Sequence, residues 1–180
     1  MNILVTGGAG FIGSNFIHHI LETHKEYNVV NYDKLTYAGN VENHTHIEND
    51  PRYTFVQGDI IDVDRLNETM QKHNITHVIN FAAETHVDRS IHGGCKDFVL
   101  TNVLGTQMIL DAVKTNNITK FVNVSTDEVY GSLPLDSDDL FTENTPVMPN
   151  MPYAAAKAGG DLMCNAYFVT HKTPVIVTHC

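Results

Sequence analysis

The stretch NILVTGGAGFIG, residues 2–13, decides the fold. It opens with a short apolar run typical of a buried strand, and an amphipathic helical pattern begins near Phe11. Between the two, Gly8, Gly10 and Gly13 match the pattern GxGxxG. Glycines at these positions permit a tight turn, a close approach of the backbone to a pyrophosphate, and close packing of helix on strand. In this strand–turn–helix context, the pattern predicts a dinucleotide-binding turn.

An acidic residue follows where such a turn requires one. Asp33 lies twenty residues beyond Gly13, just after the second apolar run, where its carboxylate can accept hydrogen bonds from an adenosine ribose. The same carboxylate would repel a 2′-phosphate, so the sequence favours NAD over NADP. Asp59 and Ile60 follow the third apolar run and could bracket the adenine, although an ordinary turn there fits the sequence nearly as well.

Apolar runs and helical patterns alternate along the whole chain. The expected strands are 2–6, 27–32, 53–57, 77–81, 120–125 and 174–178, and the expected helices are 11–23, 63–73, 98–115 and 153–171. The strands are rich in Val and Ile without a clean period of two, which is typical of parallel strands buried on both faces. The alternation predicts an α/β fold, a doubly wound parallel sheet of the Rossmann type with six strands in the order 3-2-1-4-5-6. We expect one domain over residues 1–180.

The composition narrows the class of partner. Eleven Lys and Arg against 21 Asp and Glu give a net charge of −10, and no basic run occurs, which argues against a nucleic-acid or membrane-surface partner. The sequence lacks both a long apolar segment and a secretory signal pattern, so we expect a cytoplasmic protein. Cys95, Cys164 and Cys180 lack CxxC spacing and indicate reduced thiols, and no histidine pattern predicts a metal site.

A second motif, PYAAAK at residues 152–157, places Tyr153 and Lys157 one helical turn apart on the same face. An ammonium group near a phenol favours the phenolate and is expected to lower the pKa of Tyr153 from its reference of about 10. Such a tyrosine can take a proton from a sugar hydroxyl while hydride leaves the same carbon for a nicotinamide. Lys157 could also hold the nicotinamide ribose. YxxxK also arises by chance as a surface pair, but after a dinucleotide turn it indicates a catalytic couple.

A third motif, VSTDEVYG at residues 124–131, sets two hydroxyls and then the adjacent carboxylates Asp127 and Glu128 at the end of an expected strand. Neighbouring like charges repel, and more strongly where water is scarce. The turn is therefore either a solvated helix cap, for which Ser, Thr and Asp are common, or a site for acid–base chemistry. The residues of this stretch alone leave both interpretations open.

Seven segments together resemble the extended short-chain dehydrogenase/reductase superfamily, and within it the dTDP-glucose 4,6-dehydratases. They are TGGAGFIGS, DKLTYAGN (33–40), GDI (58–60), FAAETHVDRS (81–90), TNVLGT (101–106), VSTDEVYG and PYAAAKA. The resemblance runs over essentially the whole chain, and THVDRS and STDEVYG separate this group from generic sugar epimerases. It implies that hydride passes from the hexose C4 to NAD, that water is eliminated across C5 and C6, and that the hydride returns to C6, giving dTDP-4-dehydro-6-deoxyglucose.

The resemblance also implies roles for individual residues. Asp127 would protonate the departing C6 hydroxyl, Glu128 would remove the C5 proton, and Thr126 would orient the sugar against Tyr153. Thr85 matches a substrate-contacting Ser or Thr. The matching cofactor positions are Gly7, Gly10, Phe11, Ile12, Gly13, Asp33, Lys34, Leu35, Thr36, Asp59, Ile60, Ala82, Ala83, Thr101, Tyr153 and Lys157. A nucleotide-sugar substrate and a homodimer formed through the helices 98–115 and 153–171 are implied as well.

The chain departs from the family pattern at its end. The family continues well beyond the sixth strand into a smaller domain that grips the nucleotide, whereas this chain stops at Cys180, so we expect a fragment without the substrate domain and with impaired activity. His179 stands where the family usually has Arg. The alternatives are a UDP-glucose 4,6-dehydratase or related UDP-sugar epimerase, and a catalytically silent NAD-binding module. Epimerases do not need Asp127 and Glu128, and a silent module would not need Tyr153 and Lys157.

Overall fold

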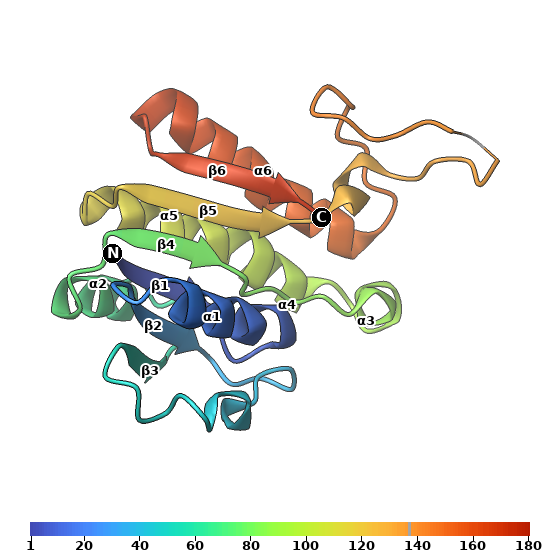
Figure 1. The fold of residues 1–180 in the computed structure, drawn as a ribbon. Helices are drawn as coiled ribbons and strands as arrows, with labels where there is room; N and C mark the ends of the chain where they lie inside the picture. Colours follow the sequence, from blue (N-terminus) through green and yellow to red (C-terminus); the bar gives the residue numbers. More distant parts are fainter. Residues whose placement is uncertain (137) are drawn as a thin grey trace.

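One six-stranded sheet organises the protein. The structure is a computed structural model that describes residues 1–136 and 138–180. The strands lie in the order β3-β2-β1-β4-β5-β6, and every pairing is parallel. Their bounds are β1 (Asn2–Thr6), β2 (Asn28–Asp33), β3 (Tyr53–Gln57), β4 (His77–Asn80), β5 (Lys120–Ser125) and β6 (Val175–His179). This confirms the doubly wound sheet and the strand order expected from the sequence (Figure 1).

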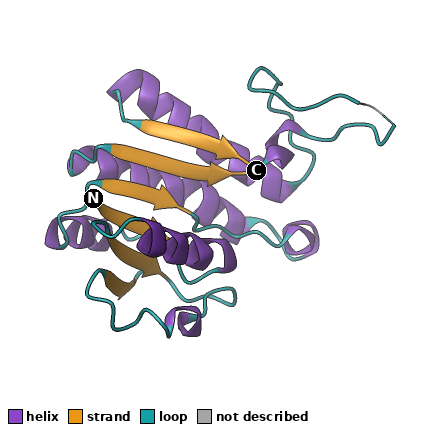
Figure 2. Ribbon diagram, in the orientation of Figure 1, coloured by secondary structure: helices purple, strands orange, loops and turns teal. Residues whose placement is uncertain are grey.

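Helices lie on both faces of the sheet, as Figure 2 shows. On one face lies α1 (Phe11–Thr23), which has the bounds expected from the sequence. The other face is covered by α2 (Val63–Lys72), α5 (Thr106–Thr115) and α6 (Pro152–His171). The strands β1 and β2 are covered on both faces, so the side chains on either face are apolar and these strands show no period of two.

The two halves of the core are built from alternate strand positions. Ile3 and Val5 of β1 pack on Ile17 of α1, while Leu4, between them, faces the opposite layer. In that layer Leu4 lies beside its register partner Val78 on β4, and Val78 in turn lies beside its register partner Phe121 on β5. All three side chains are fully buried. The sheet is therefore anchored on both sides along its central strands.

The long helix expected at 98–115 is divided. It begins as α4 (Lys96–Phe98), continues through a π-helical turn, η2 (Val99–Gly105), and ends as α5. Three short elements were not expected: η1 (Val41–His44), α3 (Val87–His92) and η3 (Asp127–Tyr130). Each is capped by a side chain that accepts a hydrogen bond from a backbone N–H of its first turn, and the three accepting residues are Asn40, His86 and Thr126. They are too short to show a hydrophobic period, so periodicity could not reveal them.

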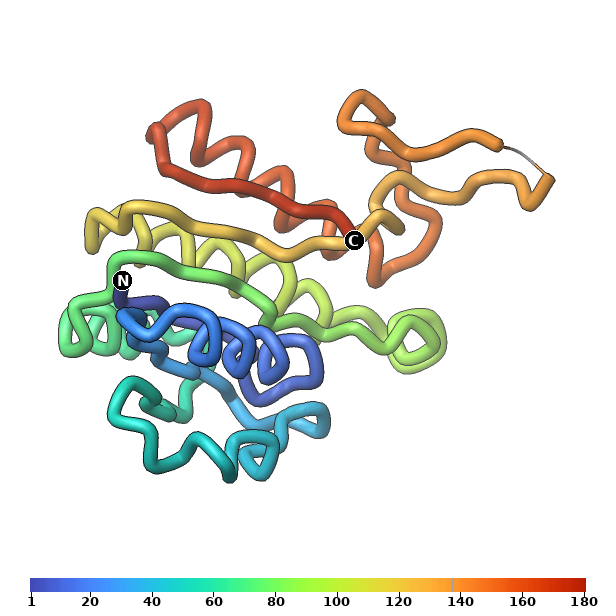
Figure 3. The backbone as a smooth tube through the Cα atoms, viewed as in Figure 1, coloured from blue at the N-terminus to red at the C-terminus, as the bar shows by residue number. Residues whose placement is uncertain are grey.

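The connection between η3 and α6 extends away from the sheet in Figure 3. Its two ends meet where Met148 N donates to Val129 O at 3.0 Å. Gly131 at its start has φ +97°, and a Cβ there would lie 2.7 Å from Met148 O. Glycine is thus needed at position 131, where the returning end of the connection passes close to its start.

Candidate active site

A cleft of about 520 Å³ lies at the carboxyl ends of the strands, the edge where ligands gather in an open α/β sheet. Every predicted cofactor or substrate residue except Leu35 lines it. Thr126, Tyr153 and Lys157 line it too, whereas Asp127 and Glu128 lie just beyond its lining. Residues from the whole length of the chain, from Gly7 to Lys157, therefore converge on one cavity, whose volume lies in the range of small-molecule sites.

The glycine-rich turn forms one wall of the cleft. Gly7 has φ +70°, and a Cβ there would lie 2.5 Å from Ala82 N, so only glycine fits. At Gly13 a Cβ would overlap the carbonyl oxygen of Gly7. Helix α1 then begins without a side-chain cap, and Phe11 and Ile12 of its first turn are 83% and 60% exposed. The first N–H groups of such a helix have no partner within the helix, so this wall fits a pyrophosphate.

Asp33, at the end of β2, is hydrogen-bonded to the glycine turn. Its Oδ2 accepts from Ala9 N at 2.9 Å and its Oδ1 from Leu35 N at 2.8 Å, and the residue is buried. Because a carboxylate has about four acceptor positions, both oxygens can still accept from a ribose. Leu35 thus contributes its backbone N–H and not its side chain. Lys34 Nζ pairs with Asp59 Oδ2 at 2.6 Å, joining the ends of β2 and β3.

Tyr153 and Lys157 are both buried at the start of α6. Lys157 Nζ donates to Val124 O at 2.6 Å. Burial lowers the pKa of Lys157, and the carboxylate of Asp161 partly opposes this. The pKa of Tyr153 is raised to about 12, first by burial and then by the charge of Glu128, although a hydrogen bond with Thr126 opposes the rise. The expected lowering of the Tyr153 pKa by Lys157 is therefore wrong for this structure, because the ammonium is directed to a β5 carbonyl and carboxylates face the phenol.

The acidic turn contains the helix cap that one interpretation of its sequence expected. Thr126 caps η3, since its Oγ1 accepts from Glu128 N at 3.3 Å. The same Oγ1 lies 3.5 Å from Asp127 Oδ1 and 3.4 Å from Glu128 Oε2. Both carboxylates also act on the pKa of Tyr153. The hydroxyl is thus a structural cap, while the two carboxyl groups are held near the phenol.

Sequence reasoning missed Asn102, which lies in the π-helical turn η2 and is buried. Its Oδ1 accepts from Glu84 N and its Nδ2 donates to Glu84 O, both at 2.9 Å. This pair of bonds fixes the backbone of Glu84, which lines the cleft, to η2. The segment TNVLGT contained the signal, since an Asn inside an apolar helical pattern needs a partner. Ser125 and Cys180 also line the cleft without having been predicted.

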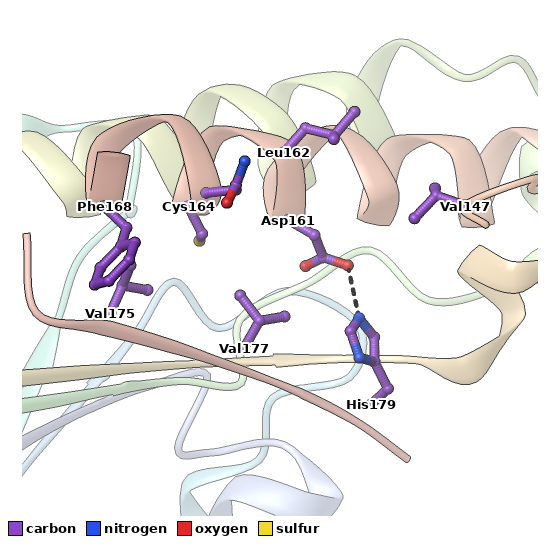
Figure 4. A pocket seen from close by; sticks show the side chains of 9 residues that line it. Val147, Asp161, Leu162, Cys164, Phe168, Val175, Val177 and His179 are labelled. Atoms are coloured by element: carbon purple, nitrogen blue, oxygen red, sulfur yellow. Dashed lines mark hydrogen bonds and ion pairs between the residues drawn. The ribbon is translucent and has the colours of Figure 1, made fainter. Parts of the chain in front are cut away.

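A second hollow of about 350 Å³ lies between α6 and β6 (Figure 4). Its walls are mainly apolar, from side chains such as Leu162, Phe168 and Val177, and none of the predicted site residues lines it. The first cleft is therefore the candidate active site. Within the described residues, no group of His, Cys, Asp or Glu is arranged to hold a metal ion. None of the helices in the same part of the chain has both the length and the apolar character to cross a membrane.

A protein-family model described as GDP-mannose 4,6 dehydratase matches residues 4–180. The chain belongs to the GDP-mannose 4,6 dehydratase family. Within this dehydratase family, the chain is 48% identical over 184 residues to the dTDP-glucose 4,6-dehydratase of Streptomyces niveus, covering 100% of this chain and 53% of that protein. The chain thus spans about half the length of the curated relatives it matches.

Solved structures of dehydratases agree with the fold. The dTDP-glucose 4,6-dehydratase of Bacillus anthracis, in complex with NAD, superposes with a TM-score of 0.90 at 47% identity, over 100% of this chain and 54% of that one. The dTDP-glucose 4,6-dehydratase of Streptomyces venezuelae, also with NAD bound, gives 0.93 at 44% identity, over 100% of this chain and 55% of the other. Both are similar to this family member over the whole of the chain.

Proposed function

We propose that this chain acts in a dTDP-glucose 4,6-dehydratase, which converts dTDP-glucose to dTDP-4-dehydro-6-deoxyglucose with NAD. One observation carries the proposal: the Thr126–Asp127–Glu128 turn adjoins Tyr153 at a cleft that the glycine turn also lines. A dinucleotide enzyme without the elimination step would need Tyr153 and Lys157 but not the two carboxylates. The identity of the relatives supports the same assignment.

The residues of the cleft fit NAD as the cofactor. The uncapped start of α1 would hold the pyrophosphate, and Asp33 would accept from the adenosine ribose. Asp59 and Ile60 would flank the adenine, and Lys157 would reach the nicotinamide ribose. The negative charge of Asp33 favours NAD over NADP. When bound, NAD supplies a reversible hydride acceptor and, in its oxidised form, a positive nicotinamide ring.

Tyr153 would take the proton from the C4 hydroxyl of the sugar. With a pKa of about 12 this phenol stays protonated near neutrality, so an additional positive charge is needed in the cleft to lower it. Lys157 lies one turn from Tyr153, but its ammonium group is bonded to Val124 O, so the additional charge would come from the oxidised nicotinamide ring. The tyrosine is therefore expected to become a base only when the cleft is loaded, which couples proton removal to cofactor binding.

The acid pair would perform the elimination. Asp127, which is exposed, would donate a proton to the departing C6 hydroxyl, and the half-buried Glu128 would remove the proton from C5. Two neighbouring carboxyl groups suit this chemistry, since their repulsion favours one protonated and one ionised group. Thr126 and Thr85, which both line the cleft, would bind the sugar.

We also propose a homodimer through the helical segments 98–115 and 153–171. Apolar side chains are exposed on both segments, namely Val99, Leu104, Leu162, Phe168 and Val169. Exposed apolar side chains on neighbouring helices are suited to a partner surface. Sedimentation of the purified chain at several concentrations tests this, and a species of single-chain mass at every concentration would contradict it.

The central experiment measures binding and turnover separately. Calorimetry with NAD tests whether the cleft binds the dinucleotide, and a chain that does not bind NAD would contradict the proposal. The chain with NAD is then given dTDP-glucose or UDP-glucose, and the absorbance of the 4-keto-6-deoxy product is read in alkali. Product from UDP-glucose alone would favour the UDP-sugar enzyme, and NAD binding with no product from either sugar would favour the silent module.

A further inference from the structure

A row of buried polar side chains crosses the sheet beneath the cleft. Thr6, Asn80 and Asn123 are register partners on β1, β4 and β5, and they are 0%, 2% and 2% exposed. Thr6 Oγ1 donates to Asn80 Oδ1 at 2.6 Å, and Asn80 Nδ2 donates to Asn123 Oδ1 at 2.8 Å. Two residues earlier on the same face lies the apolar row of Leu4, Val78 and Phe121. The polar row is thus the last layer of side chains before the ligand edge.

The row ends on one carboxylate, that of Asp161 in α6. Asn123 Nδ2 donates to Asp161 Oδ1 at 3.1 Å, and Ser125 Oγ donates to Oδ2 at 2.5 Å. His179 Nε2 lies 3.3 Å from the same Oδ2, as the dashed line in Figure 4 shows. The other ring nitrogen of His179 contacts Tyr130 OH at 3.1 Å, so the network continues into η3. Asp161 is 11% exposed by its side chain and does not line the cleft.

These contacts fix the position of α6 relative to β5. One turn before Asp161, Lys157 Nζ donates to Val124 O, so the helix is bonded to the strand end at two successive turns. Helix α6 carries Tyr153 and Lys157, and Ser125 directly precedes Thr126. The distance between the phenol and the acidic turn therefore depends on the bonds that Asp161 accepts.

Packing alone does not account for this layer. Burying amides and a carboxylate costs free energy even when every group is bonded, and an apolar row of similar volume would be no less stable. The hydrogen bonds of the network also share one donor-to-acceptor direction, because each amide or hydroxyl group named above donates toward the carboxylate of Asp161. Removing the carboxylate would leave two buried donors, Asn123 Nδ2 and Ser125 Oγ, without their acceptor.

We propose that Asp161 is a positioning residue, which locks the helix that carries Tyr153 and Lys157 against the strand end that carries Thr126. This role rests on the proposed function, since Asp161 would set the distance between Tyr153 and the acidic turn of the dehydratase site. Asp161 acts through its neighbours: it holds Ser125 and α6 in place, and its charge favours the ammonium form of Lys157, which Cys164 and Cys180 also face.

The first experiment follows the titration of Lys157 in the chain without cofactor. Lysine side-chain NMR is recorded against pH for the unaltered chain, Asp161→Asn and the matched control Asp111→Asn. Asp111 is also half-buried, lies outside the cleft lining and joins two helices, α5 and α6, by accepting from Tyr167 OH at 2.7 Å. We expect Lys157 to titrate at lower pH in Asp161→Asn and to be unchanged in Asp111→Asn. Equal titration in the two variants would overturn the proposal.

The second experiment measures NAD affinity together with thermal stability. Asp161→Asn is expected to weaken NAD binding roughly tenfold, the size of one lost charge-assisted hydrogen bond, while Asp111→Asn leaves it unchanged. Ser125→Ala keeps the charge, removes one donor and should weaken binding less, so it tests the role if Asp161→Asn does not fold. NAD affinity that is unchanged in Asp161→Asn and in Ser125→Ala would overturn the proposal. If the unaltered chain does not bind NAD, the proposed function fails, and the Lys157 titration decides the positioning role by itself.

Discussion

Asp33 Oδ2 accepts a hydrogen bond from Ala9 N at 2.9 Å, although the two residues lie 24 positions apart in the chain. The bond joins the end of β2 to the glycine turn, and the second oxygen of Asp33 is bonded to Leu35 N. One carboxylate therefore shapes the turn and also forms part of the cleft that the turn lines. Its replacement is expected to affect both folding and cofactor choice.

Asp33→Asn should destabilise the chain and relax its preference for NAD. The amide offers one acceptor oxygen where the carboxylate offers two, so a backbone N–H loses its partner at a cost of roughly 1–3 kcal/mol. The repulsion of a 2′-phosphate also disappears, so NADP affinity should rise relative to NAD. Urea unfolding and calorimetry with both cofactors measure these effects, with the exposed Asp64→Asn as control. An unchanged NADP-to-NAD affinity ratio would contradict the role of Asp33.

Substitutions at two glycines should separate binding from folding. At Gly10 a Cβ would have no neighbour closer than Gly7 O at 3.3 Å, so Gly10→Ala should fold and weaken NAD binding by occupying the pyrophosphate wall. At Gly13 the Cβ would overlap the Gly7 carbonyl, so Gly13→Ala should lower the melting temperature as well. Thermal melts and NAD titrations of both variants decide this. Equal melting temperatures for the two variants would show that the turn tolerates the overlap.

Replacing the acid pair should remove dehydration and spare the cofactor. In Asp127→Asn/Glu128→Gln neither side chain can serve as a general acid or base, while both lie outside the lining of the NAD cleft. We expect no 4-keto-6-deoxy product in alkali and a nearly unchanged NAD dissociation constant by calorimetry. Glu143→Gln, on the exposed connection after η3, is the control. If the double variant lost NAD instead, the turn would be structural only.

Acid should destabilise the chain through two histidines beside the glycine turn. His44 Nε2 donates to Gly8 O at 2.9 Å, and its Nδ1 lies 3.2 Å from His18 Nε2. Burial lowers the pKa of both rings from 6.5; His46 adds to the lowering, whereas Asp33 opposes it at His44 and Glu22 at His18. The folded state thus binds fewer protons than the unfolded state, so stability is complete above the unfolded pKa of 6.5 and is lost as the pH falls below it through the lowered pKa of the folded state.

The melting temperature should therefore fall between about pH 7.5 and about pH 5.5. His44→Leu should lower it at the higher pH, because Gly8 O loses its donor, and should also reduce its dependence on pH. Part of the dependence should remain, since burial lowers the pKa of His73 and His77 too. The exposed His92→Gln is the control. A pH dependence that is the same with and without His44 would show that this pair does not titrate as proposed.

The sequence allowed accurate prediction of the features that local pattern determines. The strands Asn2–Thr6, Tyr53–Gln57 and Lys120–Ser125 have the expected bounds, because each is an apolar run that polar or turn residues terminate. The twenty-residue spacing from Gly13 likewise predicted correctly that Asp33 lies at the end of β2. The π-helical turn Val99–Gly105 was missed, because its apolar residues continue the pattern of the helix that follows.

What the sequence could not predict depends on contacts between distant segments. The pKa of Tyr153 follows from its burial and from Glu128, and neither can be read from YxxxK spacing. Lys157 donates to Val124, a partner that only the packing of α6 on β5 defines. The place of Asp127 and Glu128 outside the cleft lining likewise depends on how η3 turns after Thr126. Their roles in elimination stay predictions.

The polar layer of Thr6, Asn80 and Asn123 also bears on how the sheet assembles. A slip of one residue between β1 and β4 would set Thr6 opposite Ile79 or Phe81 and leave buried hydroxyl and amide groups facing hydrocarbon. Apolar rows alone would tolerate such a slip far better. The amides thus penalise misaligned pairing while the chain is still collapsing, so strand register would be selected before any ligand arrives.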